Sequence, residues 1–243
     1  MTTPRILVLW TAIAALAPAQ LTTDQKLADF GHLAGLYAKQ YAPYEWKREL
    51  FGFDALRIGA WLERAARTKD DLGFYDLCIE YVASLRDTHD AYSLPSNFAA
   101  TLNLTVDIYD GKVLIDLINR ARLRPAEYPF EVGDELVSVD GKPVDELLEA
   151  FAKYAVQANP RSARRRAASG IVTRSQSRNP HAPEVGEAAT VAIRRASGTL
   201  ETYRIPWTRT GVPLQVGPVP APKSAPLPRA AAADEQPEYL RAL

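Results

Sequence analysis

The sequence predicts an α+β protein in which a small helical bundle precedes a β-rich domain. From Thr22 to Leu85, apolar residues recur at steps of three and four, which is the period of an amphipathic helix. After Pro95 they alternate with polar residues instead, which is the period of a half-buried strand. This change of period predicts a helical domain over residues 20–98 and a β-rich domain over residues 99–208.

Three helices are expected in the first of these domains. The first starts at Thr22, whose side chain can cap it, and ends before Pro43. The second opens at Asp54 and the third at Asp70 or Asp71. Their apolar faces, which would form the core of the bundle, consist of Leu27, Phe30, Leu33, Leu36, Tyr37 and Tyr41, then Leu56, Trp61, Leu62 and Ala65, then Phe74, Leu77, Cys78, Tyr81, Val82 and Leu85.

The β-rich domain begins with a predicted hairpin over residues 102–118, turning at Asp110-Gly111. A short strand over residues 135–139 then leads through a turn at Asp140-Gly141 to a helix from Pro143. Two last strands, residues 188–195 and 200–207, close the domain. Residues 156–184, between the predicted helix and these strands, look like an insertion, which is partly helical and rich in Arg and Ala.

The two ends of the chain have distinct compositions. Arg5, the short apolar run Ile6 to Leu16 and Ala17-Pro18-Ala19 are typical of a secretory signal peptide over residues 1–19. Residues 209–243 are rich in Pro and Ala, which predicts a semi-extended linker or tail. We therefore expect export to the periplasm or cell surface of a bacterium, with no membrane contact beyond the signal peptide. The lone Cys78 cannot form an intrachain disulfide, so the fold must depend on its core.

Charge and motifs exclude several classes of function. The 29 basic and 29 acidic residues balance, so no overall charge indicates nucleic-acid binding. The basic cluster Arg161, Arg164, Arg165 and Arg166 is interpreted as the solvated face of a helix. The chain has no G-x-G, C-x-x-C, H-E-x-x-H, G-x-S-x-G or S-x-x-K string, so neither a cofactor nor a metal site is expected.

The string "SLRDTHDAY" holds the best catalytic candidate, His89. Asp87 could orient its imidazole, as an acid does for a catalytic base. The spacing alone is more typical of a turn residue at a helix end, because no serine of the chain stands in a recognisable nucleophile setting. The other histidines, His32 and His181, are expected at the surface.

The segment "VGDELVSVDGKPVDELLEAF" resembles the signature of PDZ domains. Gly133 and Gly141 would serve two tight turns, and Leu136 and Val139 would point inward. The resemblance implies a partly open β-barrel with a groove helix, which binds an extended peptide or a protein C-terminus as an added strand. On this resemblance the peptide would lie against Leu102, Leu104, Val106, Val144, Leu147, Leu148 and Phe151.

The order of the segments resembles the N-terminal half of the C-terminal-processing (tail-specific) serine proteases. That family closes its helical region with an L-x-D-x-H string, which Leu85, Asp87 and His89 match. Its nucleophilic serine lies in a domain after the PDZ domain, and the sequence ends at Leu243 without one. The resemblance therefore implies a peptide-binding portion without proteolytic activity of its own, in which Asp87 and His89 are idle. A stand-alone PDZ-type adaptor, and one chain of a split protease completed by a separate catalytic domain, remain as alternatives.

Overall fold

The computed structural model describes residues 20–214, so the predicted signal peptide and most of the predicted tail lie outside the described residues. Helices come first, and strands with two further helices follow, which confirms the α+β prediction. The elements are α1 (Thr23–Gln40), α2 (Tyr44–Phe51), α3 (Gly59–Ala66), α4 (Asp71–Ala83), β1 (Ala99–Thr101), β2 (Leu104–Tyr109), β3 (Lys112–Ile118), β4 (Glu135–Val139), β5 (Lys142–Pro143), α5 (Val144–Ala152), α6 (Pro160–Val172), β6 (Thr173–Ser175), a 3-10 turn η1 (Ala182–Glu184), β7 (Ala188–Arg194), β8 (Leu200–Pro206) and β9 (Thr208–Thr210).

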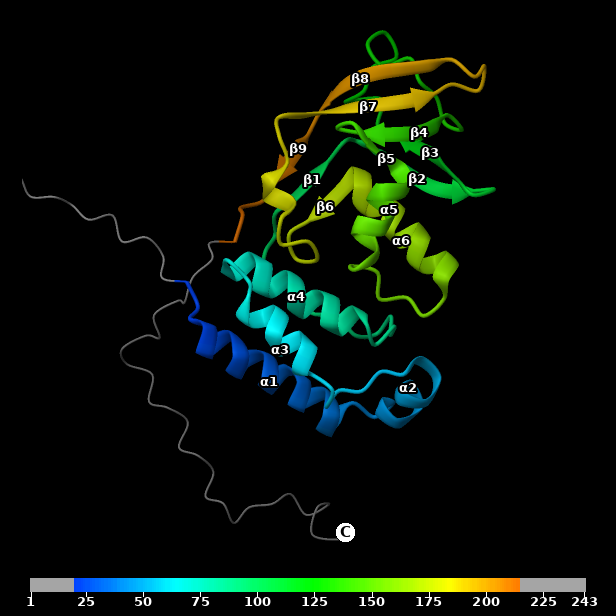
Figure 1. The fold of residues 1–243 in the computed structure, drawn as a ribbon. Coiled ribbons are helices and arrows are strands. Elements are labelled where there is room, and N and C mark those ends of the chain that lie inside the picture. Colours follow the sequence, from blue (N-terminus) through cyan, green and yellow to red (C-terminus); the bar gives the residue numbers. More distant parts are fainter. Residues whose placement is uncertain (1–19, 215–243) are drawn as a thin grey trace, which may run out of the picture. The chain divides into compact units, whose positions relative to one another are not determined.

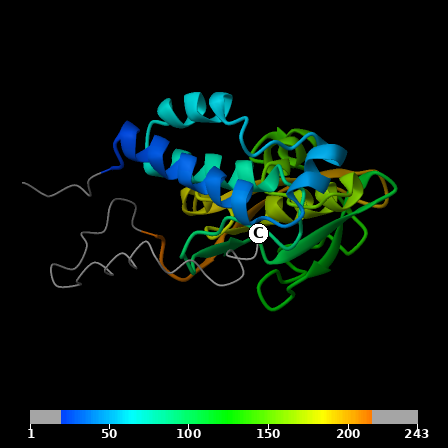
Figure 2. The ribbon, with the colours of Figure 1, turned by 90° about the horizontal axis from the view of Figure 1, so that it is seen from below.

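Helices α1, α3 and α4 pack together around Tyr81, a fully buried side chain of α4 (Figures 1 and 2). The ring of Phe30 meets that of Tyr81 edge-on at a centroid distance of 4.9 Å, and Trp61 does so at 5.3 Å. Such aromatic pairs add about 0.5–1.5 kcal/mol each beyond the area they bury. The aromatic residues of the predicted helices thus form the core of the bundle.

The helical region contains one helix more than the three predicted. The first helix ends before Pro43, as predicted, but a further helix, α2, starts directly after Pro43, where the missing N–H of the proline costs no hydrogen bond. Asp54 does not open a helix either. Its carboxylate accepts the amide of Leu56 at 3.0 Å in a local turn, and α3 starts at Gly59.

The strands form two open antiparallel sheets, and no closed barrel exists among residues 20–214. The larger sheet has the order β2-β3-β4-β7-β8, with β5 paired to β4, and the smaller one has the order β6-β1-β9. The hairpin between β2 and β3 turns at Asp110 and Gly111, which both have positive φ angles. This is the two-residue hairpin turn that matches the twist of a sheet.

The signature segment predicted around Gly133 folds as its residue types require. Gly133 has a φ of 95°, and Asp140 and Gly141, between β4 and β5, have φ angles of 51° and 76°. Leu136 and Val139 are almost fully buried in the core of this domain. Helices α5 and α6 lie on the side of the larger sheet that faces α4 (Figure 1).

The helical bundle contacts the β-rich domain through α4. Asp76 accepts a hydrogen bond from the hydroxyl of Tyr154 at 2.6 Å and pairs with Lys153. Leu94, in the connection after α4, donates its amide to the carbonyl of Ser177 at 2.9 Å. None of the helices within residues 20–214 has the length and apolar character that crossing a bilayer requires.

Candidate functional site

The first candidate site is the turn that follows α4, where Asp87 and His89 lie. Asp87 accepts a hydrogen bond from the Tyr41 hydroxyl at 2.5 Å, and Lys47 Nζ lies 3.9 Å from the same carboxylate oxygen. Its other oxygen accepts the backbone amide of His89 at 3.0 Å. Asp87 therefore binds the backbone of His89 and anchors the turn to the bundle, and it makes no hydrogen bond to the imidazole within the described chain.

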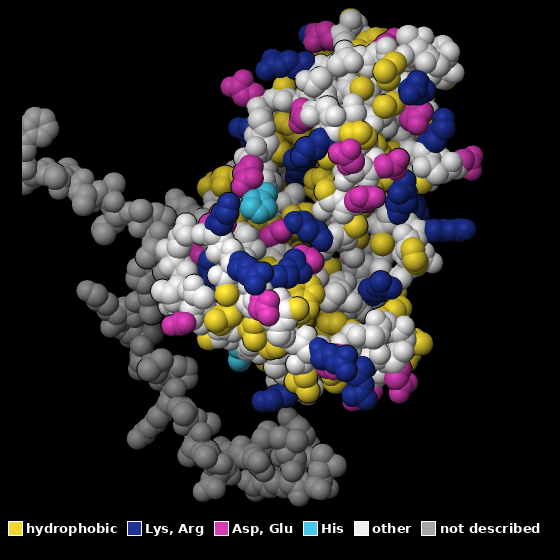
Figure 3. Space-filling view, in the orientation of Figure 1, with side chains coloured by type: hydrophobic (Ala, Val, Ile, Leu, Met, Phe, Trp, Pro, Cys, Tyr) yellow, Lys and Arg dark blue, Asp and Glu magenta, His cyan; other side chains and the backbone are white. Residues whose placement is uncertain are grey.

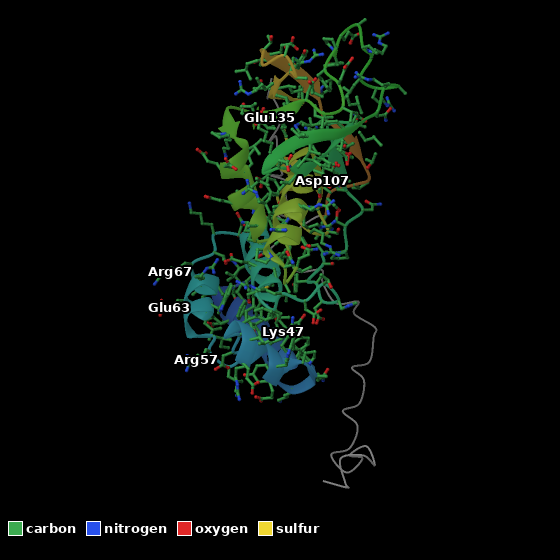
Figure 4. All side chains as sticks on the ribbon, turned by 90° about the vertical axis from the view of Figure 1, so that its right-hand side faces the viewer. Lys47, Arg57, Glu63, Arg67, Asp107 and Glu135 are labelled. Atoms are coloured by element: carbon green, nitrogen blue, oxygen red, sulfur yellow. The ribbon has the colours of Figure 1, made fainter. Side chains whose placement is uncertain are left out.

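Lys47 joins α2 to this turn from inside the bundle. Lys47, labelled in Figure 4, is only 3% exposed. Its ammonium donates a hydrogen bond to the carbonyl of Arg86 at 2.9 Å. Burying an ammonium is costly unless it is paired and hydrogen-bonded. The carboxylate of Asp87 and the carbonyl of Arg86 supply those partners, which holds Arg86 at a φ of 52° and fixes the path of the chain.

The two acids of the turn have opposite pKa shifts. Burial raises the pKa of Asp87, but the hydrogen bonds from Tyr41 and from the His89 amide and the charge of Lys47 outweigh burial, so the pKa lies below its usual value. Burial and the charge of Asp87 raise the pKa of Asp90. The side chain of His89 is exposed. The arrangement stabilises Asp87 as an anion and leaves the imidazole open to whatever meets this face.

Replacing Asp87 with asparagine is expected to lower the free energy of unfolding at neutral pH by about 1–3 kcal/mol, because Lys47 loses its counter-charge. The folded-state pKa is lowered, so the contribution of the carboxylate is complete above the unfolded pKa of about 3.9. It is lost as pH falls through the lower folded value. Urea unfolding should therefore show a gap between wild type and variant that narrows below about pH 4.

The exposed Asp24, in the first turn of α1, provides the matched control for this measurement. The substitution Asp24→Asn should change the free energy of unfolding by less than about 0.5–1 kcal/mol, the size of a helix-dipole effect at the surface. A gap for Asp87→Asn that stays constant from neutral to acidic pH would contradict the assignment of the stabilisation to its charge.

The second candidate site is the free edge of the larger sheet, at β2. Because Tyr109 and Lys112 flank a two-residue turn, they form the hydrogen-bonded pair of the hairpin. Alternation then points the backbone groups of Ile108 and Val106 away from β3. The Ile108 amide indeed donates to a side chain, the carboxylate of Asp107, at 2.7 Å. The outer edge of β2 thus carries backbone groups that the sheet does not pair.

Helix α6, rather than α5, lies beside this edge. The guanidinium of Arg165 in α6 holds Asp107 in β2, which Figure 4 labels, through two parallel hydrogen bonds, one of them 2.7 Å from Nε to Oδ1. This pair and the hydrogen bond to Ile108 keep the pKa of Asp107 below its usual value, despite partial burial. Helix α5 packs against α6, β4 and β5 instead.

The peptide-contact residues predicted from sequence fall into two groups, which differ in how deeply they are buried. Six of them are core side chains, with exposures between 0% and 8%: Leu102, Leu104, Val106, Val144, Leu147 and Leu148. Phe151 is half-buried at the contact between α5 and α6. A peptide added to β2 would therefore meet its backbone rather than these six side chains.

Asp107, Arg165 and the position of α6 were not predicted as parts of the site. The sequence signal was the arginine cluster, which was interpreted as a solvated helix face. These arginines are exposed on α6, as predicted, but Arg165 also pairs with Asp107, and Arg164 pairs with Asp145 of α5 at 2.8 Å. Among residues 20–214, no group of three or more His, Cys, Asp or Glu side chains is arranged to hold a metal ion.

Comparison with known proteins agrees with this architecture. Residues 99–215 match the family model of the PDZ domain. The predicted PDZ resemblance is confirmed.

The helical region and the PDZ domain together share their fold with mature CPAF. The structure of mature CPAF complexed with lactacystin aligns with a TM-score of 0.68 and 24% identity, over 80% of this chain and 36% of that one. A second structure of mature CPAF aligns with a TM-score of 0.63 over 77% of this chain. This similarity establishes the fold.

Curated relatives come from Chlamydia. An uncharacterised protein of Chlamydia muridarum is 28% identical over 202 residues, which cover 81% of this chain and 32% of the relative. A protein of Chlamydia pneumoniae is 25% identical over 206 residues, covering 83% of this chain and 32% of the relative. The chain thus spans about a third of the length of these relatives.

Proposed function

We propose that this chain is the exported, peptide-binding N-terminal portion of a tail-specific serine protease. The observation that carries the proposal is the PDZ domain with its unpaired strand edge at β2. The order of a helical bundle followed by a PDZ domain, in a fold shared with CPAF, supports the protease assignment. Export is supported only by the composition of residues 1–19.

The peptide is proposed to bind as an extra antiparallel or parallel strand along β2. The Ile108 amide, which donates to the Asp107 carboxylate in this structure, would donate to a carbonyl of the peptide instead. Val106 would supply the next outward pair of backbone groups. Main-chain pairing of this kind gives affinity with little dependence on the peptide's side chains.

Titration of fluorescent peptides into the purified chain tests this proposal. Each peptide is prepared with a free C-terminal carboxylate and with an amidated end. Strand addition without carboxylate capture predicts saturable binding of both forms with similar Kd values. Absence of saturable binding up to about 1 mM, where the binding free energy is only about −4 kcal/mol, would exclude the proposed site.

We further propose that Asp87 and His89 act in catalysis only when a nucleophile domain is supplied. The exposed imidazole of His89 supports this, since a second domain could reach it. The chain alone is expected not to cleave casein or a tailed substrate. Cleavage that His89→Ala abolishes, and that His32→Ala leaves intact, would overturn this expectation.

A further inference from the structure

A cavity of about 170 Å³ lies on the PDZ domain between the end of α5, the second half of α6 and β6. Three arginines line it: Arg166 from α6, Arg174 from β6 and Arg178 from the turn that follows. The other lining residues are Phe151, Tyr154, Ser169, Gly170, Thr173, Ser175 and Asn179. The lining thus contains three positive charges and no carboxylate. We call it the arginine cavity.

The three guanidinium groups have no partners within the described part of the chain. Neither Arg166, Arg174 nor Arg178 has a carboxylate within ion-pair distance or a side-chain hydrogen bond among residues 20–214. Elsewhere basic and acidic side chains are interspersed, as the face in Figure 3 shows. Arg164 and Arg165, on the same helix, each pair with an aspartate. The arginine cavity therefore concentrates cations that the fold itself does not neutralise.

Arg174 is the side chain that the fold fixes most firmly in this cavity. Its guanidinium carbon lies 5.2 Å from the ring centre of Phe151 and 5.0 Å from that of Trp207. Nε is buried and has no hydrogen-bond partner among residues 20–214. Burial lowers the pKa of Arg174, against the charge of Asp140, which raises it. An arginine held between two aromatic rings with unused donors is preorganised for an acceptor.

The walls of the cavity give it a defined shape. A Cβ atom at Gly170 would lie 2.8 Å from Phe151 Cδ1, so the glycine permits this ring to pack directly on α6. Tyr154 donates its hydroxyl to Asp76, and Lys153 neutralises that acid, so Asp76 does not repel an anion. The C-terminal end of α6 carries partial negative charge, which disfavours an anion in this cavity. The attraction for an anion would therefore come from the three arginines.

We propose that the arginine cavity binds an oxyanion, a phosphate or carboxylate group, at a site distinct from the β2 edge. The planar guanidinium groups match both oxyanions in geometry and donate charge-assisted hydrogen bonds to them. A ligand that carries such a group would be anchored on the face of α6 that carries Arg166, Ser169 and Gly170. The oxyanion would accept hydrogen bonds from the unused donors of Arg174. Its negative charge would offset the repulsion between the three arginines.

Isothermal titration calorimetry of the purified chain with inorganic phosphate, and separately with acetate, tests the proposal. Saturable binding of either at constant ionic strength supports it, and the stronger of the two identifies the oxyanion. Arg178→Gln and Arg166→Gln should each weaken binding about tenfold, the effect of one charge-assisted hydrogen bond. Arg174→Gln should abolish it.

Arg161→Gln is the matched control, because Arg161 is exposed in the first turn of α6 and does not line the cavity. It should bind phosphate as wild type does. Should Arg174→Gln fail to fold, as judged by circular dichroism, the variants at Arg166 and Arg178 decide the outcome. The absence of saturable binding, or equal binding by all four variants, would overturn the proposal. A chain that binds phosphate but no peptide would refute only the proposed peptide function.

Discussion

Replacing Asp134 with alanine is expected to destabilise the PDZ domain by about 3–5 kcal/mol, the cost of removing one partner of a buried ion pair. Asp134, the acid of the Gly-Asp signature, is 4% exposed. Its carboxylate accepts the amides of Glu131 at 2.7 Å and Ala196 at 3.0 Å, and Arg195 Nε lies 2.9 Å away. Alanine would leave both amides without their acceptor and would leave a partly buried guanidinium beside an empty space.

Urea unfolding, followed by circular dichroism, measures this loss. Asp145→Ala is the matched control, because Asp145 is 82% exposed and its pair with Arg164 lies at the surface. That variant should lose less than about 1 kcal/mol. An equal decrease in the free energy of unfolding in the two variants would contradict this role. Asp134 would then not stabilise the contact between the turn before β4 and the loop after β7.

The second large effect concerns peptide binding. Ile108→Pro removes the one β2 amide that the structure shows donating away from β3. Proline is tolerated on edge strands whose N–H faces outward, so the fold should persist. Peptide affinity should fall at least about tenfold, because the main-chain hydrogen bond to the added strand is lost.

Ile108→Val is the control for this variant, since it keeps the amide and changes the side chain by a single methylene. It should bind peptide within about twofold of wild type and cost about 0.5–1.5 kcal/mol of stability. If both variants bind peptide equally well, the ligand does not pair with β2. Unfolding curves of both variants separate lost binding from lost structure.

The fold could be predicted from sequence where local chemistry determines it. The turn at Asp140-Gly141 needs positive φ angles, and Gly and Asp are the residue types that adopt them. The buried side chains Val113 and Ile115 alternate with less buried ones along β3. This local pattern predicts a strand with one face in the core. These features predict the turn and the strand, and the resemblance of residues 132–151 to the PDZ signature predicts the domain, which the family comparison confirms.

The position of α6 could not be predicted in the same way. Arg165 and Asp107 are 58 residues apart, and neither sequence context differs from that of a solvated charge. Their pairing arises only when α6, whose Ala168 and Ile171 are fully buried, packs against β2. The catalytic and peptide-binding roles of the residues proposed from sequence, including Asp87 and His89, remain predictions.

An extended peptide that pairs with the outer edge of β2 would change the environment of the amides along that strand. The most direct measurement is amide NMR of the labelled chain during titration with a saturating peptide. We expect chemical-shift changes and slowed hydrogen exchange at the amides of Val106 and Ile108, with Thr202 on the opposite edge strand β8 unchanged. Changes confined to β8 or to the arginine cavity, with the β2 amides unaffected, would contradict this pairing.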